Sequence, residues 1–266
     1  MRKHYLYRIK AVRMLDPIIK VENLTKNYGD FEAVKGLSFE VYPGEIFGLL
    51  GPNGAGKSTT LEIIETLRQK TSGKVIVNGF DIEKDADEIK KIIGVQLQTA
   101  GFYPGLNLVE LLDLFAGLYN EEIDPMAILD SVNLRDKAKA KFKELSGGQK
   151  QRFSIATTLI NKPKLIFLDE PTTGLDPQAR RNLWDLIRSI RDSGTTVVIT
   201  THYMDEAEYL CDRFAIMDAG KIIALDQPDQ LIDQLLANGF EKQKESKGAN
   251  LEDVFINLTG HTLRED

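Results

Sequence analysis

The chain has 266 residues, of which 42% are hydrophobic and 28% charged, a composition typical of a globular protein that buries a substantial core. Its formal net charge of −6 argues against a general nucleic-acid-binding protein, which normally presents net positive charge or a long basic stripe. The single cysteine, Cys211, excludes an intramolecular disulfide, and no apolar run reaches the roughly 20 residues that a membrane-spanning helix needs.

The first third of the chain predicts short strands separated by turns. Apolar runs and alternation predict strands over residues 18–21, 37–41, 45–50, 74–77 and 92–97. Turn residues at 29–30 and 43–44 separate the first three strands, and Asn78-Gly79 predicts a tight hairpin. A glycine-rich loop over 51–58 leads into a helix predicted over 59–67. Residues 1–15 precede these elements and are expected to form a flexible extension.

The character of the sequence changes between residues 98 and 145. Apolar residues recur there at helical spacing, which predicts a helical subdomain over about 99–145 inserted into an α/β core. Apolar runs at 165–168 and 197–200 predict interior strands of a mostly parallel sheet. A hairpin is expected from 214–217 and 222–225, followed by a helix over 228–236. We therefore expect one domain over 16–240, then a charged linker and an amphipathic C-terminal segment over 241–266.

Residues 51–58 match the pattern G-x-x-x-x-G-K-[ST] in full, after a predicted strand and before a predicted helix. Glycines let the backbone wrap closely around phosphate oxygens and turn N–H donors toward them, beside the positive end of a helix. Lys57 can neutralise the β- and γ-phosphates, and the Ser58 hydroxyl can bind Mg²⁺. The predicted nucleotide-binding residues are Gly51, Pro52, Asn53, Gly54, Ala55, Gly56, Lys57, Ser58 and Thr59. The alternative, a purely structural glycine turn, is disfavoured by this strand–loop–helix context.

Two acidic residues end the strand predicted at 165–168. Asp169 would lie at the carboxyl end of the sheet, where it suits the Mg²⁺ shell, directly or through water. Glu170 could polarise the water that attacks a γ-phosphate. Alone this pair is a weak signal, because strands often end in solvated charge, but with the phosphate loop it predicts a hydrolytic site. His202 follows the strand at 197–200 and is expected to contact the γ-phosphate, although a lone histidine is more often structural.

A second anion-binding helix start is predicted at 145–149, just before an apolar-periodic helix. Ser146 is a good helix cap, and Gly147 and Gly148 again permit close backbone approach to an anion, with Gln149 beside them. One nucleotide has only one triphosphate. Two such segments in one chain therefore indicate a site shared between subunits.

Four elements in this order resemble the nucleotide-binding domain of ATP-binding cassette (ABC) proteins, over residues 18–225. They are 51–58, 145–149, 165–170 and His202. The resemblance implies an α/β P-loop NTPase (RecA-like) core with a mostly parallel sheet, an N-terminal antiparallel β subdomain and an inserted helical subdomain. It also implies ATP and Mg²⁺ as cofactors and a catalytic set of Lys57, Gln98, Glu170 and His202.

Three further residues gain roles only from the resemblance. Tyr28 would stack on adenine, Gln98 would sense Mg²⁺ and the attacking water, and Asp176 would communicate across a dimer. Read without the family, Tyr28 is an ordinary strand-end tyrosine, and Asp176 is a helix cap before Pro177.

The resemblance implies a head-to-tail dimer, either of two identical chains or with a related cassette. Residues 146–149 of one subunit would close on the γ-phosphate held by Lys57 of the other. ATP would bind the closed state better, so binding drives closure and hydrolysis reverses it. A separately encoded transmembrane permease is the expected partner, docking near residues 100–107 and holding the chain at the cytoplasmic face of the membrane. No nucleic-acid partner is expected.

Residues 201–208 and 251–260 resemble those of the group that exports drugs, lipids and polysaccharides. The alternative is a non-transport cassette ATPase that acts on ribosomes or DNA. Translation factors of this kind carry two cassettes, and chromosome proteins carry a long coiled coil, whereas this chain has one cassette and no sustained heptads. A binding-only regulatory cassette is a third possibility, against which the presence of Glu170 and His202 argues.

Overall fold

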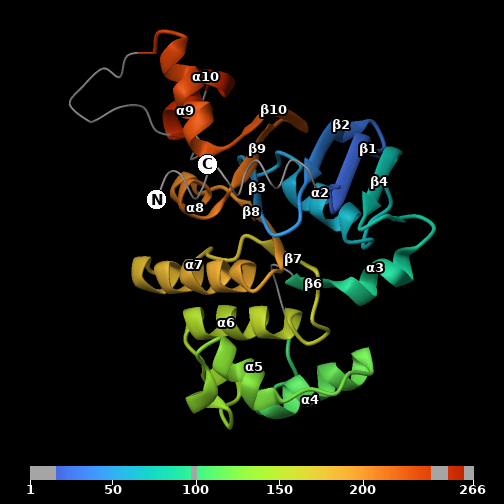
Figure 1. The fold of residues 1–266 in the computed structure, drawn as a ribbon, viewed down its shortest axis with the longest axis vertical. Coiled ribbons are helices and arrows are strands. Elements are labelled where there is room, and N and C mark those ends of the chain that lie inside the picture. The colour runs from blue at the N-terminus through green and yellow to red at the C-terminus, as the bar shows by residue number, and fades with distance from the viewer. Residues whose placement is uncertain (1–15, 97–100, 241–250, 261–266) are drawn as a thin grey trace.

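A computed structural model describes residues 16–96, 101–240 and 251–260, which form two β-sheets with helices packed around them (Figure 1). The predicted extension over 1–15, Gln98 and the charged linker at 241–250 lie outside the described residues.

The smaller sheet is antiparallel and has the strand order β2-β1-β4-β5. Its strands are β1 (Ile19–Tyr28), β2 (Phe31–Val41), β4 (Ser72–Val77) and β5 (Phe80–Asp81). The hairpin predicted at Asn78-Gly79 is confirmed, because it joins β4 to β5. The first two strands are longer than predicted, since they continue into half-exposed, polar residues on both sides of the turn at Gly29-Asp30.

The larger sheet has the order β10-β9-β3-β8-β7-β6. Its strands are β3 (Ile46–Leu50), β6 (Ile93–Gln96), β7 (Leu165–Asp169), β8 (Thr196–Thr201), β9 (Arg213–Asp218) and β10 (Lys221–Asp226). Every neighbouring pair is parallel except β9 and β10, which form the predicted final hairpin. The fold class expected from the sequence, an α/β core with a mostly parallel sheet and an antiparallel N-terminal sheet, is thus confirmed.

Helices cover both faces of the larger sheet and also form a separate group at one end of the molecule (Figure 1). They are α2 (Lys57–Ile64), α3 (Ala86–Ile92), α4 (Leu108–Tyr119), α5 (Pro125–Ser131), α6 (Gly147–Thr158), α7 (Pro177–Asp192), α8 (Met204–Leu210), α9 (Pro228–Ala237) and α10 (Leu251–Thr259), with 3-10 turns η1 (Arg135–Lys137) and η2 (Phe142–Glu144). Helix α2 ends earlier than predicted, because Glu65 caps it and Thr66 has a φ of 64°. Among the described residues, no helix is both long and apolar enough to cross a membrane.

The larger sheet is buried on both faces, which explains why its strands are continuous apolar runs. Successive side chains of β3 enter different cores: Ile46 and Leu50 pack in one cluster, Phe47 and Leu49 in the other. The carboxyl ends of β3, β7 and β8 consequently emerge at one edge of a rigid layer. Polar residues that follow these ends are held together there.

Candidate functional site

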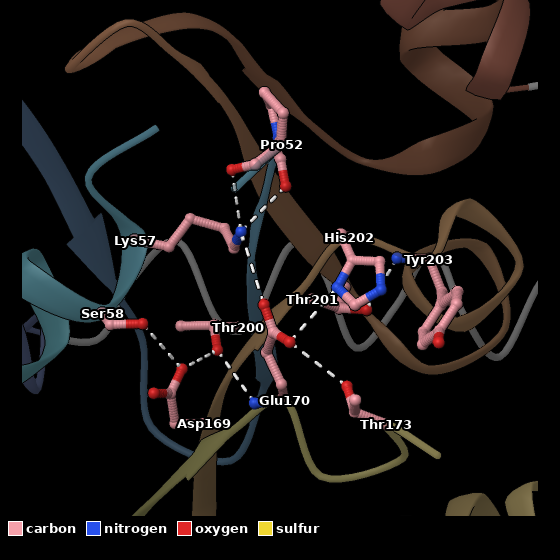
Figure 2. Close-up of polar contacts among 11 residues, drawn as sticks. Pro52, Lys57, Ser58, Asp169, Glu170, Thr173, Thr200, Thr201, His202 and Tyr203 are labelled. Carbon is pink, nitrogen blue, oxygen red and sulfur yellow. Dashed lines mark hydrogen bonds and ion pairs between the residues drawn. The ribbon is translucent and has the colours of Figure 1, made fainter. Parts of the chain in front are cut away.

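Three segments that are far apart in the sequence meet at the carboxyl edge of the larger sheet. The phosphate loop follows β3, Asp169 ends β7 with Glu170 directly after it, and His202 follows β8. The strand register sets their spacing, since Leu50 lies beside Thr201 and Asp169 beside Thr200. Figure 2 shows the resulting cluster of side chains.

The phosphate loop wraps tightly at two glycines, where a residue with a Cβ atom would collide with the backbone. A Cβ atom on Gly51 would lie 2.2 Å from the carbonyl oxygen of Met217. Gly56 has a φ of 95°, and a Cβ there would lie 2.6 Å from the carbonyl oxygen of Ala33. Gly56 is also the N-cap of α2, and as a glycine it has no side chain that could cap the helix. The first N–H groups of an α-helix have no acceptor within the helix, so those of α2 are suited to bind an anion at the phosphate loop.

Lys57 crosses the phosphate loop from the first turn of α2 and is almost fully buried. Its Nζ donates to the carbonyl oxygens of Gly51, at 2.9 Å, and Pro52, at 3.0 Å, and lies 3.6 Å from Glu170 Oε1 (Figure 2). Burial lowers the pKa of Lys57, while Glu170 and Asp169 act in the opposite direction. The amine thus sits at the centre of the site with acidic groups around it.

Asp169 is held by hydroxyl groups from two different elements. Ser58 Oγ lies 3.2 Å from Asp169 Oδ1, and Thr200 Oγ1 donates to the same oxygen. A hydroxyl and a carboxylate at this distance form the hard oxygen pair that suits Mg²⁺. The described residues contain no group of three or more His, Cys, Asp or Glu side chains able to hold a metal. Mg²⁺ in this place would therefore need further oxygens from nucleotide and water, which is its usual behaviour in nucleotide sites.

Glu170 occupies an unusual backbone conformation for a residue with a side chain, with a φ of 47°. Its N–H is bonded to the Thr200 carbonyl, at 3.2 Å, and to Thr200 Oγ1, at 3.0 Å. Its carboxylate accepts from Thr173 Oγ1 at 3.2 Å, and His202 Nδ1 lies 3.2 Å from Oε2. The interaction with His202, helped by Lys57 and Thr173 and opposed by burial, lowers the pKa of Glu170 to about 2. Glu170 is therefore ionised at neutral pH.

The contact between His202 and Glu170 is close but not aligned. His202 Nδ1 is within ion-pair distance, yet it has no partner of hydrogen-bond geometry among the described residues. A small rotation of the imidazole ring would align the two groups. The ring also packs on Tyr203, with centroids 4.1 Å apart. His202 thus retains a polar atom beside the site that a bound group could engage.

The second predicted anion-binding segment, residues 146–149, lies away from this cluster. Ser146 and Gln149 form a reciprocal cap at the start of α6, where Ser146 Oγ accepts from the Gln149 N–H at 3.4 Å and Gln149 Oε1 accepts from the Ser146 N–H at 2.9 Å. No hydrogen bond or ion pair within the described ranges joins them to the phosphate loop, and α6 lies below α7, away from α2 (Figure 1). Within one chain, the two anion-binding helix starts remain separate.

Asp176 is a helix cap and Tyr28 ends a strand, as each would without a functional role, and both side chains are exposed. Asp176 Oδ1 caps α7 by accepting from the N–H groups of Gln178, at 3.0 Å, and Ala179, at 2.9 Å. Tyr28 ends β1 with 41% of its surface exposed, and Arg68 Cζ lies 5.4 Å from its ring centre. The expected role of Gln98 cannot be placed, since that residue lies outside the described part of the chain.

Sequence reasoning missed Thr200 as a functional residue. Its hydroxyl joins Asp169 to the N–H of Glu170, so one side chain orients both acids. The available signal was a threonine one residue before the end of a buried strand, on the strand next to the acidic one. The role of this threonine can be recognised only when it is known that β8 pairs with β7.

Together these features define the class of the protein. A phosphate loop between a strand and an uncapped helix, a hydroxyl–carboxylate pair and a buried Lys–Glu contact are the parts of a P-loop nucleoside triphosphatase.

Comparison with known proteins narrows the class to a family. The sequence profile of the family described as "ABC transporter" matches residues 34–173. The "Nod factor export ATP-binding protein I" of Rhizobium etli is 42% identical over 229 residues, covering 84% of this chain and 72% of that protein. The "Linearmycin resistance ATP-binding protein LnrL" of Bacillus subtilis is 41% identical, covering 82% of this chain and 72% of the relative.

Solved structures agree with this assignment. One described as "Structure of ATP binding subunit of ABC transporter" superposes with a TM-score of 0.77 at 27% identity, covering 91% of this chain and 99% of the other. Another, "Dimeric structure of a post-hydrolysis state of the ATP-binding cassette MJ0796 bound to ADP and Pi", has a TM-score of 0.70 at 29% identity, covering 79% of this chain and 98% of the other. The chain therefore belongs to the ABC transporter family, as an ATP-binding and ATP-hydrolysing cassette that uses ATP with Mg²⁺.

The double role of Thr200 gives a prediction. In Thr200→Val, the buried N–H of Glu170 loses one of its two acceptors and Asp169 loses a donor. We expect a loss of about 1–3 kcal/mol in the free energy of unfolding. We also expect ATP turnover to fall by about tenfold or more, because both acids lose their orientation. Urea unfolding and phosphate release measure the two effects.

Thr196→Val is the matched control at the other end of β8. Thr196 is as deeply buried as Thr200, and its hydroxyl accepts from the Gly44 N–H at 3.0 Å. It should lose similar stability and keep its turnover. Equal turnover in the two variants would contradict the orienting role of Thr200.

Proposed function

We propose that this chain powers an exporter by hydrolysing ATP at the carboxyl edge of its larger sheet, with a separately encoded transmembrane permease as its partner. One observation carries this proposal: Lys57, Ser58, Asp169, Glu170 and His202 converge there from α2, β7 and the end of β8. The names of the relatives from Rhizobium etli and Bacillus subtilis, which refer to export and to resistance, support the direction of transport.

The residues that bind nucleotide are proposed from the geometry of the phosphate loop. The N–H groups of the first turn of α2 and the amine of Lys57 would bind the phosphates, with residues 51–59 lining the loop. Ser58 and Asp169 would hold Mg²⁺, with Gln98 proposed beside them. When bound, Mg²⁺ supplies positive charge that neutralises phosphate oxygens. Tyr28, whose ring is accessible at the end of β1, is proposed to stack on adenine.

The hydrolytic roles are proposed for Glu170 and His202. The ionised carboxylate of Glu170 would accept a hydrogen bond from the attacking water and orient it. His202, with its polar Nδ1 atom lacking an aligned partner among the described residues, would contact the γ-phosphate. Lys57 would lie on the phosphate side of Glu170, because it contacts both the loop and the carboxylate.

A head-to-tail dimer is proposed because each chain carries two anion-binding helix starts that lie apart. Ser146, Gly147, Gly148 and Gln149 of one subunit would close on the phosphates held by the other, with Asp176 near the contact. The dimer would consist of two copies of this chain, or of this chain and a related cassette. The dimeric cassette structure with ADP and Pi supports the formation of a dimer.

The proposed division of the chain follows the same logic. Residues 16–240 would form the cassette, 99–145 its helical subdomain, 241–266 a C-terminal linker and amphipathic segment, and 1–15 an extension. Attachment to the permease would place the protein at the cytoplasmic face of the membrane. The named relatives support transport over an action on ribosomes or DNA.

Glu170→Gln tests the hydrolytic role directly. The amide keeps the size of the side chain but is a poor acceptor for a proton from water, so kcat should fall by about a hundredfold or more. ATP binding should persist, and an ATP-bound dimer should accumulate in size-exclusion chromatography. Glu88→Gln, on the exposed surface of α3, is the control and should behave as wild type. Unchanged turnover in Glu170→Gln would remove Glu170 from this role.

Purification of the full chain from gently solubilised native membranes tests the transport role. A polytopic membrane protein should co-purify, with docking near residues 100–107. Tyr103, which is 66% exposed, should contribute, so Tyr103→Ala should reduce co-purification. Phe31→Ala, which removes a similarly exposed aromatic from β2, should not. Recovery of ribosomes or DNA-associated proteins, without a membrane protein, would overturn the transport role.

A further inference from the structure

Helix α8 carries a buried carboxyl group that the proposed reaction does not use. Glu206 has no exposed surface, and it lies on the inward face of α8 with Ala207 and Leu210. Its neighbour Asp205 is exposed. Burying a carboxyl group is unfavourable unless polar partners surround it. The polar partners of Glu206 therefore indicate the role of its carboxyl group.

One partner is the chain's single tryptophan. Trp184, on α7, donates from Nε1 to Glu206 Oε1 at 2.9 Å. Trp184 is itself almost fully buried, so the bond is shielded from water and fixes α8 against α7. Helix α7 begins directly after Asp176, which caps it. The carboxyl group is thus connected to the segment that follows the acidic strand.

The other partners are two buried threonines. The hydroxyls of Thr201 and Thr172, together with Trp184, favour the charged form of Glu206, but burial outweighs them and raises its pKa. Glu206 Oε2 and Thr172 Oγ1 each lack a well-aligned partner among the described residues, although the two groups interact. A small rotation of either side chain would align Glu206 Oε2 with Thr172 Oγ1.

Each partner belongs to a segment that carries a residue of the proposed site. Thr172 is two residues after Glu170, in a turn closed by the Leu175 N–H on the Thr172 carbonyl at 3.2 Å. Thr201 directly precedes His202, and its hydroxyl accepts from the Tyr203 N–H at 2.9 Å. Glu206 is thus bonded to helix α7 and interacts with hydroxyl groups of the loop after β7 and of the turn after β8. Helix α8, which carries Glu206, begins at Met204, two residues after His202.

We infer that Glu206 is a positioning residue for ATP hydrolysis. It holds the turn that carries His202 and the loop that carries Glu170 at a fixed separation. The 3.2 Å distance between His202 Nδ1 and Glu170 Oε2 depends on that separation. This inference rests on the proposed function of Glu170 and His202. Glu206 and Thr200 act on different parts of the site. Thr200 orients the backbone of Glu170 through a hydrogen bond to its N–H, whereas Glu206 orients the loops on either side.

A merely structural role makes a different prediction. If Glu206 only filled the core, its replacement would lower stability and leave the catalytic rate constant of the folded protein unchanged. If Glu206 is a positioning residue, its replacement should lower kcat and leave KM for MgATP nearly unchanged. Nucleotide binding uses α2 and the phosphate loop, and within the described residues no hydrogen bond joins Glu206 to either.

The test compares Glu206→Leu with Glu206→Gln in the full chain. Leucine removes every polar contact, and we expect kcat to fall about tenfold or more while KM for MgATP stays within about threefold. Glutamine keeps the acceptor for Trp184 and offers an uncharged donor to Thr172, so it should restore kcat to within about threefold of wild type. Phosphate release over a range of MgATP concentrations gives both constants.

Glu45→Leu is the matched control. Glu45 is also a buried carboxyl group, and it lies 3.2 Å from Arg213 at the amino end of β3, the opposite end from the site. It should lose thermal stability, measured by far-UV circular dichroism, without loss of kcat. Should Glu206→Leu fail to fold, Trp184→Phe replaces it, because it removes the Nε1 donor, keeps an aromatic ring and should lower kcat by more than about threefold.

The outcomes separate this inference from the proposed function. Wild-type kcat in folded Glu206→Leu, or in Trp184→Phe where the leucine variant does not fold, would overturn the positioning role and leave the ATPase role intact. Failure of glutamine to restore kcat while the fold is kept would also overturn it. If the wild-type chain hydrolysed no ATP, or Glu170→Gln hydrolysed it normally, the proposed function would fail and the positioning role with it.

Discussion

The parallel register of β3, β8 and β7 is the constraint on which the site depends. Thr200 lies beside Asp169, and Thr201 lies beside Leu50, the last residue before the phosphate loop. A shift of one residue in either pairing would turn alternate side chains to the opposite face and separate these groups. The two hydrophobic clusters resist such a shift, because each strand fills both of them with alternate residues. Packing on both faces of the sheet therefore sets the geometry at its edge.

At that edge, one basic group and several acidic ones share a largely buried space. Desolvation disfavours both the charged Lys57 and a charged carboxylate, so each is tolerated only with polar partners. Lys57 finds two carbonyls and Glu170, and Glu170 finds Thr173 and His202 as well. A phosphate group would offer Lys57 a stronger partner than a carbonyl oxygen. The same contacts that stabilise the fold thus prepare the exchange of partners that nucleotide binding requires.

Much of the site was predictable because its parts are local patterns. The phosphate loop, the acids after β7 and His202 after β8 each follow a buried strand that can be recognised from its apolar residues. The contributions of Thr200 and Glu206 were not predictable, since each depends on which strands and helices are neighbours. Local sequence also placed the ends of β1 and β2 poorly, because antiparallel pairing, rather than hydrophobic alternation, extends these strands through polar residues.

A crystal structure of the full chain with Mg²⁺ and a non-hydrolysable ATP analogue tests the central claim most directly. The account predicts that the Lys57 amine contacts a phosphate oxygen, that Ser58 and Asp169 lie in the metal's shell, and that Glu170 and His202 face the γ-phosphate. Strands β3, β7 and β8 should keep their present register. A nucleotide bound elsewhere, with the contact between Lys57 and Glu170 unchanged, would contradict the account.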